Sequence, residues 1–155
     1  MTKLIQAVHR WEPIEGIPET PTYDFAIESD ADGQLKLRLS YSLVAGNDDR
    51  DMQLIFASVL AFRTHWDGDK PAVGRISDPP RCLSGPCAGF TWPLLIVKYS
   101  EWLASEDFDV SRAVSSAAGE ESWRQFSVVA MQRSIDVIAR GAVSATWLRA
   151  PRTEQ

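Results

Sequence analysis

The sequence lacks the residues and motifs on which most enzyme families depend. It has only two histidines, His9 and His65, and two cysteines, Cys82 and Cys87, in 155 residues. None of the common signatures occurs: there is no G-x-S-x-G, S-x-x-K, H-E-x-x-H or G-x-G-x-x-G, and no P-loop. We therefore favour a non-enzymatic function, and we expect no catalytic residues, no metal and no cofactor.

Long apolar segments are missing as well. The longest, residues 54–62, covers less than half of the roughly 20 residues that a membrane helix needs, and His9-Arg10 interrupts the start before a signal peptide could form. These features predict a cytoplasmic protein. The formal net charge of −5 disfavours nucleic acids and anionic membranes as partners and favours a basic protein.

Alternating hydrophobicity dominates the rest of the chain and predicts antiparallel strands. Residues 23–27 and 35–43 alternate around Asp32-Gly33, a pair typical of a tight hairpin turn. Residues 52–65 are apolar at both alternating positions, which predicts a central strand buried on two sides. On that pattern we expect one of its faces to carry Leu54, Phe56, Leu60 and Phe62, and the other Ile55, Ala57, Val59 and Ala61.

We therefore expect one mainly β domain over residues 1–155, an antiparallel sheet or sandwich of about six to eight strands with one or two short helices between Ser100 and Ala118. Residues 1–22 are expected to be an extended lead-in, and residues 150–155 a frayed tail. Strands are also expected at residues 92–97, 123–131 and 135–139. After Arg140-Gly141, a separate last strand is expected at residues 143–148.

The end of the central strand holds the strongest candidate for a ligand site. Arg63, His65 and Trp66 follow one another closely there, and with Trp92 they offer the large aromatic and few polar groups that pockets use. The alternative is a strand that emerges into solvent, with Asp67-Gly68 making a turn. Of the two, we favour the second.

Acidic loop residues are the candidates for partner binding. They form two groups, Asp48, Asp49 and Asp51, and Glu106, Asp107 and Asp109. Such groups are usually solvated loop charges, and only their coincidence on one face would make a docking surface. For Cys82 and Cys87 we favour two ordinary thiols over a zinc site or a short-loop disulfide.

The order of several segments resembles small uncharacterised bacterial β-rich proteins. A strand ending in RTHW is followed by WPLLIVKYSEWL, by WRQFSVVAMQRSIDVIA and by a closing Trp147, over roughly residues 52–148. Some proteins of that kind are similar to immunity partners of secreted toxins. The resemblance implies a binding module and carries over no catalytic residue.

Three functional hypotheses follow. The favoured one is a non-enzymatic protein-binding module, in its most concrete form an immunity or antitoxin-like partner of a basic bacterial protein. The second is a small-ligand-binding protein or unrecognised enzyme, which predicts that His65 lies within hydrogen-bond reach of a carboxylate. The third is a subunit of a homo-oligomer, with exposed tryptophans or an unpaired edge strand meeting a second copy.

Overall fold

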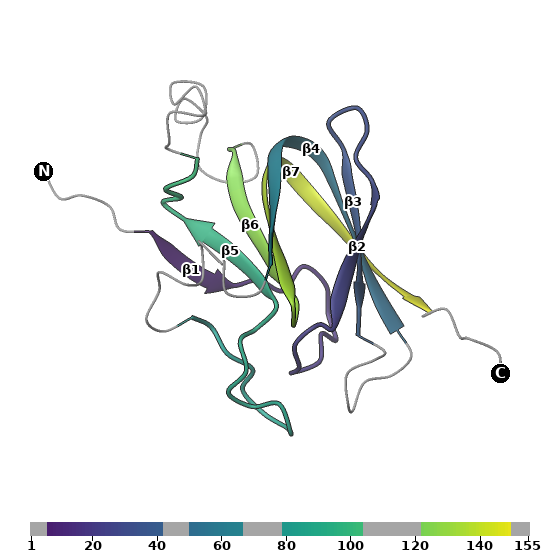
Figure 1. Cartoon of the computed structure of the whole chain (residues 1–155), viewed down its shortest axis with the longest axis vertical. Coiled ribbons are helices and arrows are strands. Elements are labelled where there is room, and N and C mark those ends of the chain that lie inside the picture. The colour runs from purple at the N-terminus through teal and green to yellow at the C-terminus, as the bar shows by residue number, and fades with distance from the viewer. Residues whose placement is uncertain (1–5, 42–49, 67–78, 104–121, 150–155) are drawn as a thin grey trace, which may run out of the picture.

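The described part of the chain forms one antiparallel β-sheet. The computed structural model describes residues 6–41, 50–66, 79–103 and 122–149. The strands are β1 (Ala7–Arg10), β2 (Asp24–Ser29), β3 (Leu35–Ser40), β4 (Arg50–Trp66), β5 (Leu94–Lys98), β6 (Arg124–Val129) and β7 (Arg133–Arg149). Their order in the sheet is β1-β5-β6-β7-β4-β3-β2 (Figure 1). The expected fold class, a mainly β antiparallel sheet, is confirmed.

The β2–β3 hairpin is closed by the turn that the sequence indicates. Asp32 and Gly33 both have positive φ, 57° and 74°, and the amide of Gln34 donates to the carbonyl of Ala31. Positive φ at both central residues is the geometry that suits the right-handed twist of the flanking strands. Asp-Gly accepts that geometry at little cost, so the local sequence sets this hairpin.

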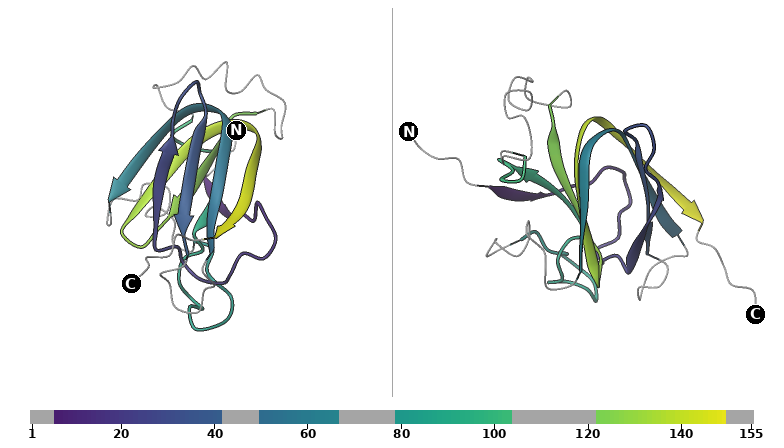
Figure 2. Two further views of the ribbon diagram at one scale, coloured as in Figure 1. Left: turned by 90° about the vertical axis from the view of Figure 1, so that its right-hand side faces the viewer. Right: turned by 45° about the horizontal axis from the view of Figure 1, so that its top comes forward.

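The two longest strands bend, and this bend gives the molecule its shape. β4 and β7 each span 17 residues and pair with one another along nearly their whole length. The pairing shifts register between Phe56 and Ser58 and between Val59 and Ala61, and Gly141 on β7 has a φ of 85°. Because bulges bend strands, the sheet curls until its two halves face each other (Figure 2). The last expected strand is thus the continuation of β7 beyond Gly141.

The bulges also change which side chains of β4 reach the core. Met52, Leu54 and Phe56 are fully buried, and beyond the two register shifts Val59 and Phe62 pack against the same cluster. A strict alternation put Val59 on the other face, and that expectation is wrong because the alternation is interrupted at the register shifts, the first with an extra residue on β7 and the second with an extra residue on β4. The central position of β4 between β3 and β7 is confirmed, but burial on two sides is not: on its second face Ile55 is half-buried and Ala57 exposed.

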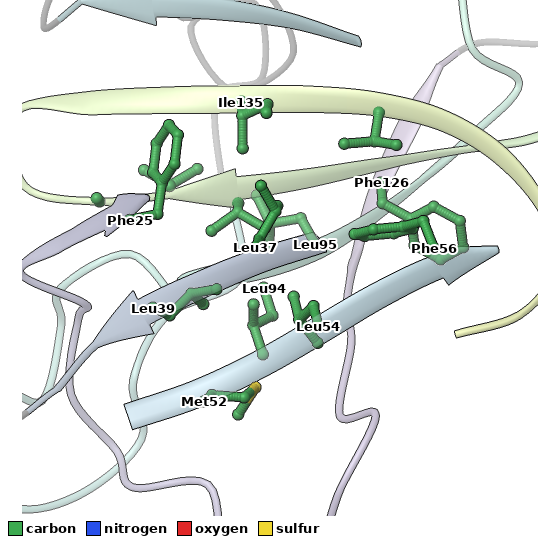
Figure 3. Packing of buried hydrophobic residues seen from close by; sticks show 14 of the residues in the cluster. Phe25, Leu37, Leu39, Met52, Leu54, Phe56, Leu94, Leu95, Phe126 and Ile135 are labelled. Carbon is green, nitrogen blue, oxygen red and sulfur yellow. The ribbon is translucent and has the colours of Figure 1, made fainter. Parts of the chain in front are cut away.

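The core fills the space between the two halves of the curled sheet. Side chains of β2, β3 and the first half of β4 meet those of β5, β6 and the first half of β7, as Figure 3 shows for Phe25, Leu37, Leu94, Phe126 and Ile135. The lead-in closes one side, since the ring of Trp11 lies 4.7 Å from that of Phe126 between centroids. Each half of the sheet therefore buries the apolar face of the other.

Two margins of the chain differ in detail from the expected pattern or lie partly outside the described residues. Residues 7–10 of the expected lead-in form β1, which pairs with β5 at one edge of the sheet. No helix occurs within the described residues; Ser100 accepts a hydrogen bond from the amide of Leu103 (3.0 Å), as a cap would, but only a turn follows. Residues 104–118, where the expected helices would continue, and the tail at 150–155 lie outside the described residues.

Candidate functional site

A buried carboxylate gathers three polar side chains on the face of the sheet that looks away from the core. Asp136 of β7 is 2% exposed. Its Oδ1 accepts a hydrogen bond from Ser127 Oγ (2.5 Å), and its Oδ2 accepts one from Arg63 Nε (3.2 Å). The Nε2 of His65 lies 3.1 Å from the same Oδ2. We call Arg63, His65, Ser127 and Asp136 the Asp136 cluster.

Strand register explains why these residues meet. Ser127 on β6 is directly opposite Asp136 on β7, which is directly opposite Arg63 on β4. Side chains of directly opposed residues leave the same face about 5 Å apart, so the three form one row across the sheet. His65 is two residues beyond Arg63 and therefore shares its face.

The geometry of the cluster is that of a structural polar network and differs from that of a nucleophilic triad. In a triad the serine donates to the histidine, whereas Ser127 donates to Asp136 and is completely buried. The contact between His65 Nε2 and Asp136 Oδ2 joins the imidazole to the same oxygen that accepts from Arg63. What the network does chemically is hold Arg63 and His65 in fixed positions.

Trp102 completes the surroundings of Arg63. Its ring lies 4.0 Å from the guanidinium carbon of Arg63, in a cation–π contact. The side chain of Arg63 keeps 34% of its exposure, whereas that of His65 keeps 11%. Arg63 is therefore the member of the cluster that solvent reaches most easily.

The four residues of the expected ligand pocket are divided between two faces. Arg63 and His65 come together, and His65 does reach a carboxylate as the ligand hypothesis predicted. Trp66 pairs with Arg133 on the opposite face of β4, because side chains alternate along a strand. Trp92 is fully buried; its Nε1 donates to the carbonyl of Trp11 (3.1 Å).

A second feature is an exposed apolar surface at the end of the sheet where β4 finishes. Trp66 is 69% exposed, Met131 53% and Tyr23 44%. Each of the three is close to Arg133 in the register or along the chain: Trp66 is directly opposite Arg133, Met131 is two residues before it, and Tyr23 precedes Asp24, to which Arg133 is bonded. We call Tyr23, Trp66 and Met131 the Trp66 surface.

Backbone pairing brings Tyr23 and Met131 to the same side. Thr22 and Ala130 form a parallel bridge and are both buried. Tyr23 and Met131 follow these two residues in the chain, so the bridge brings the two exposed side chains into the same region. Leu83, on the loop between β4 and β5, is 75% exposed.

An ion pair ties that loop to the lead-in. Arg10 hydrogen-bonds Glu19, and the amide of Leu83 donates to Glu19 Oε2 (2.8 Å). The Arg10 guanidinium, with the Leu83 amide adding to its effect, holds the pKa of Glu19 below its usual range. The same pair raises the pKa of Arg10.

Of the acidic residues expected to bind a partner, the structure describes Asp51. It is 4% exposed, and its Oδ2 accepts a hydrogen bond from Arg38 Nε (2.8 Å), so it does not present a free surface charge. The others, Asp48, Asp49, Glu106, Asp107 and Asp109, lie outside the described residues.

Both cysteines are free thiols. Cys82 is buried, and burial raises its pKa to about 11. Cys87 is half-buried and accepts a weak hydrogen bond from Thr20 Oγ1 (3.4 Å). Among the described residues no group of three or more His, Cys, Asp or Glu side chains is placed to bind a metal ion.

Reasoning from the sequence missed Asp136, Ser127 and the Trp66 surface as a whole. A signal for Asp136 was present, since it is the one charged residue within the apolar segment Ile135–Ala139 of a strand. A carboxylate at a buried strand position needs donors from neighbouring strands. Finding them requires the register.

Comparison with protein-family models, with curated proteins and with solved structures gave no match. The resemblance to bacterial immunity-like proteins therefore stays a prediction. No helix among the described residues has the length and apolar character needed to span a membrane.

Proposed function

We propose that the protein is a non-enzymatic protein-binding module that docks its partner on the Trp66 surface. The observation that carries the proposal is the exposure of Tyr23, Trp66 and Met131 around Arg133. Large apolar side chains that gather on a surface mark sites of interaction, whereas scattered ones need no explanation. Tryptophan, tyrosine, methionine and arginine are also the residue types enriched in protein interfaces.

The support beneath this surface is rigid. Arg133 donates from Nε to Asp24 Oδ1 (2.8 Å) and from Nη2 to the carbonyl of Phe25, and its guanidinium carbon lies 4.2 Å from the ring of Phe25. These contacts join the start of β7 to the start of β2 across the open side of the curled sheet. A surface that is already ordered loses little conformational entropy on binding.

The charge of the chain favours a basic partner. A formal net charge of −5 attracts a basic protein over a distance and raises the association rate, more so at low salt. The most concrete form of the proposal is an immunity or antitoxin-like module that neutralises a basic bacterial protein. In that form the long-range charge steers the partner, and the apolar contact at Trp66 holds it.

Affinity capture with matched variants tests the proposal. Wild-type protein, Trp66→Ser and Tyr99→Ser serve as bait. Tyr99 is the control, because it is also an exposed aromatic residue (55% exposed) but follows the C-terminal end of β5, at the end of the sheet opposite to Trp66. Removing an interface tryptophan commonly costs at least 2 kcal/mol, roughly a thirty-fold loss of affinity. We expect one stoichiometric partner with the wild type and with Tyr99→Ser, and its loss with Trp66→Ser.

Salt and self-association separate the alternatives. A steered basic partner should bind more slowly as the salt concentration rises. Recovery of a second copy of this chain would replace the proposal with the homo-oligomer hypothesis. Equal capture by wild type and Trp66→Ser would show that the docking surface lies elsewhere.

A further inference from the structure

Arg63 is held in place by the protein on one edge and one face of its guanidinium group. Its Nε donates to the buried carboxylate of Asp136 (3.2 Å), and the ring of Trp102 lies 4.0 Å from the guanidinium carbon. Asp136 is itself fixed by Ser127 and His65. The orientation of this arginine is thus set by the fold before any ligand arrives.

The opposite edge of the same guanidinium has no such partner. Arginine has five N–H donors, and the contact with Asp136 uses the one on Nε. Within the described residues no acceptor takes the donors on Nη1 and Nη2, and 34% of the side chain is exposed. The donors on Nη1 and Nη2 are therefore left for a ligand or for water.

The chemistry of that free edge selects a carboxylate. The end-on edge of a guanidinium matches the two oxygens of a carboxylate in a bidentate pair. Asp136 already balances the charge of Arg63, so a monoanion with a flat pair of oxygens fits better than a phosphate dianion. Trp102 covers one face of the guanidinium and lowers the competition from water.

We propose that the Nη1–Nη2 edge of Arg63 is a binding site for a carboxylate group. Arg63 contacts the ligand, Asp136 is a positioning residue, and Trp102 packs against the guanidinium. The carboxylate can belong to a small organic acid or to the C-terminus of a peptide. The site lies on the face of β4 opposite to Trp66, so it is independent of the docking surface proposed above.

Side-chain NMR of arginine tests the site directly. The full-length protein, labelled with ¹⁵N, is titrated with sodium acetate against sodium chloride at equal ionic strength, and the Nε–Hε signals are followed. The Nε–Hε signals of Arg63 and Arg140 are assigned in the wild type by through-bond correlation to their backbone resonances in a ¹³C,¹⁵N-labelled sample, and their loss in Arg63→Lys and Arg140→Lys checks the assignment. We expect it to shift with saturation, at a half-saturating acetate concentration on the order of 1–10 mM.

Arg140 provides the matched control. Its guanidinium carbon lies 4.8 Å from the ring of Trp123, yet among the described residues no carboxylate orients it. The proposal predicts that its signal shifts no more with acetate than with chloride. Equal shifts at Arg63 and Arg140, or a response of Arg63 that chloride reproduces, would overturn the proposal, and this comparison within the wild type holds even if Arg63→Lys does not fold.

Two further probes identify the source of the carboxylate. Acetyl-Ala-Ala with a free C-terminus is compared with its C-terminal amide. If the free acid binds at least ten-fold more tightly than acetate and the amide does not bind, the site takes a peptide C-terminus. If acetate binds as well as the peptide acid, the site takes small organic acids. Binding of the amide as strongly as the acid would contradict a carboxylate site.

Discussion

Replacing Asp136 with alanine should destabilise the protein more than any other loss of a charged side chain described above. The substitution removes the shared acceptor of Ser127, Arg63 and His65. Ser127 is completely buried, so its hydroxyl is left without its acceptor inside the protein. Arg63 loses the carboxylate that balances its charge.

The magnitude follows from burial. Breaking a buried ion pair from one side commonly costs 3–5 kcal/mol, and an orphaned buried hydroxyl 1–3 kcal/mol. Because Arg63 is 34% exposed and regains some hydration, we expect a value at the lower end, about 3 kcal/mol in the free energy of unfolding. For a chain of this length that corresponds to a fall in Tm of about 6–12 °C.

Urea unfolding followed by tryptophan fluorescence and far-UV circular dichroism measures the effect. Asp24→Ala is the control, because Asp24 also pairs with an arginine at 2.8 Å but keeps 46% of its side-chain exposure. Exposed pairs contribute at most about 1 kcal/mol. A cost below about 1 kcal/mol for Asp136→Ala, or an equal cost for the two variants, would refute the reasoning.

Three further predictions follow from single groups. At pH 8 the thiol of Cys87 should react quickly with iodoacetamide, whereas Cys82 should stay unmodified until the protein is unfolded, because Cys82 is buried and its pKa is raised to about 11. Mass spectrometry counts the adducts, and rapid labelling of both thiols would contradict the burial of Cys82. Gly141→Ala should lower the free energy of unfolding by about 1–2 kcal/mol, because a φ of 85° is unfavourable for alanine, although a Cβ there would meet no atom within 4 Å. An unchanged urea midpoint would argue against the bend at this residue. Glu19→Gln should cost about 1 kcal/mol at pH 7. Arg10 lowers the folded-state pKa of Glu19, so the stabilising contribution of Glu19 is present above the unfolded-state pKa of about 4.3 and is lost as the pH falls through the lower folded-state value. Wild type and Glu19→Gln should therefore become equally stable in strong acid. A difference in stability that stays constant at all pH values would count against the Arg10–Glu19 ion pair.

Local sequence was enough to predict the parts of the fold that depend on local rules. The β2–β3 hairpin followed from alternation on both sides of Asp32-Gly33, because that pair accepts the positive φ of its turn. The central place of β4 followed from its apolar character at both alternating positions. These rules involve neighbours within a few residues.

Features that depend on distant partners were not predictable in the same way. The two register shifts between β4 and β7 interrupt the alternation of side chains, and only the pairing of the two strands shows where they occur. As a result, alternation placed Val59 on the wrong face. The edge strand β1 is four residues long and carries too short a pattern to be seen without its partner β5.

The candidate site shows the same division. His65 was expected near a carboxylate, and it lies near Asp136, which is distant in sequence. The alternation of side chains along a strand already implied that Arg63 and His65 share a face and that Trp66 does not. The partners Ser127 and Asp136 depended on the register of three strands.

Photo-crosslinking at the Trp66 surface tests the central claim most directly. A benzoylphenylalanine residue is placed at position 131 in place of Met131, or at position 99 in place of Tyr99 as the control, and the protein is irradiated in the cells from which it comes. We predict one specific crosslinked protein at position 131 and none at position 99. Crosslinks only at position 99, or none at position 131 under conditions in which a partner is captured, would contradict the assignment of the docking surface to Trp66 and its neighbours.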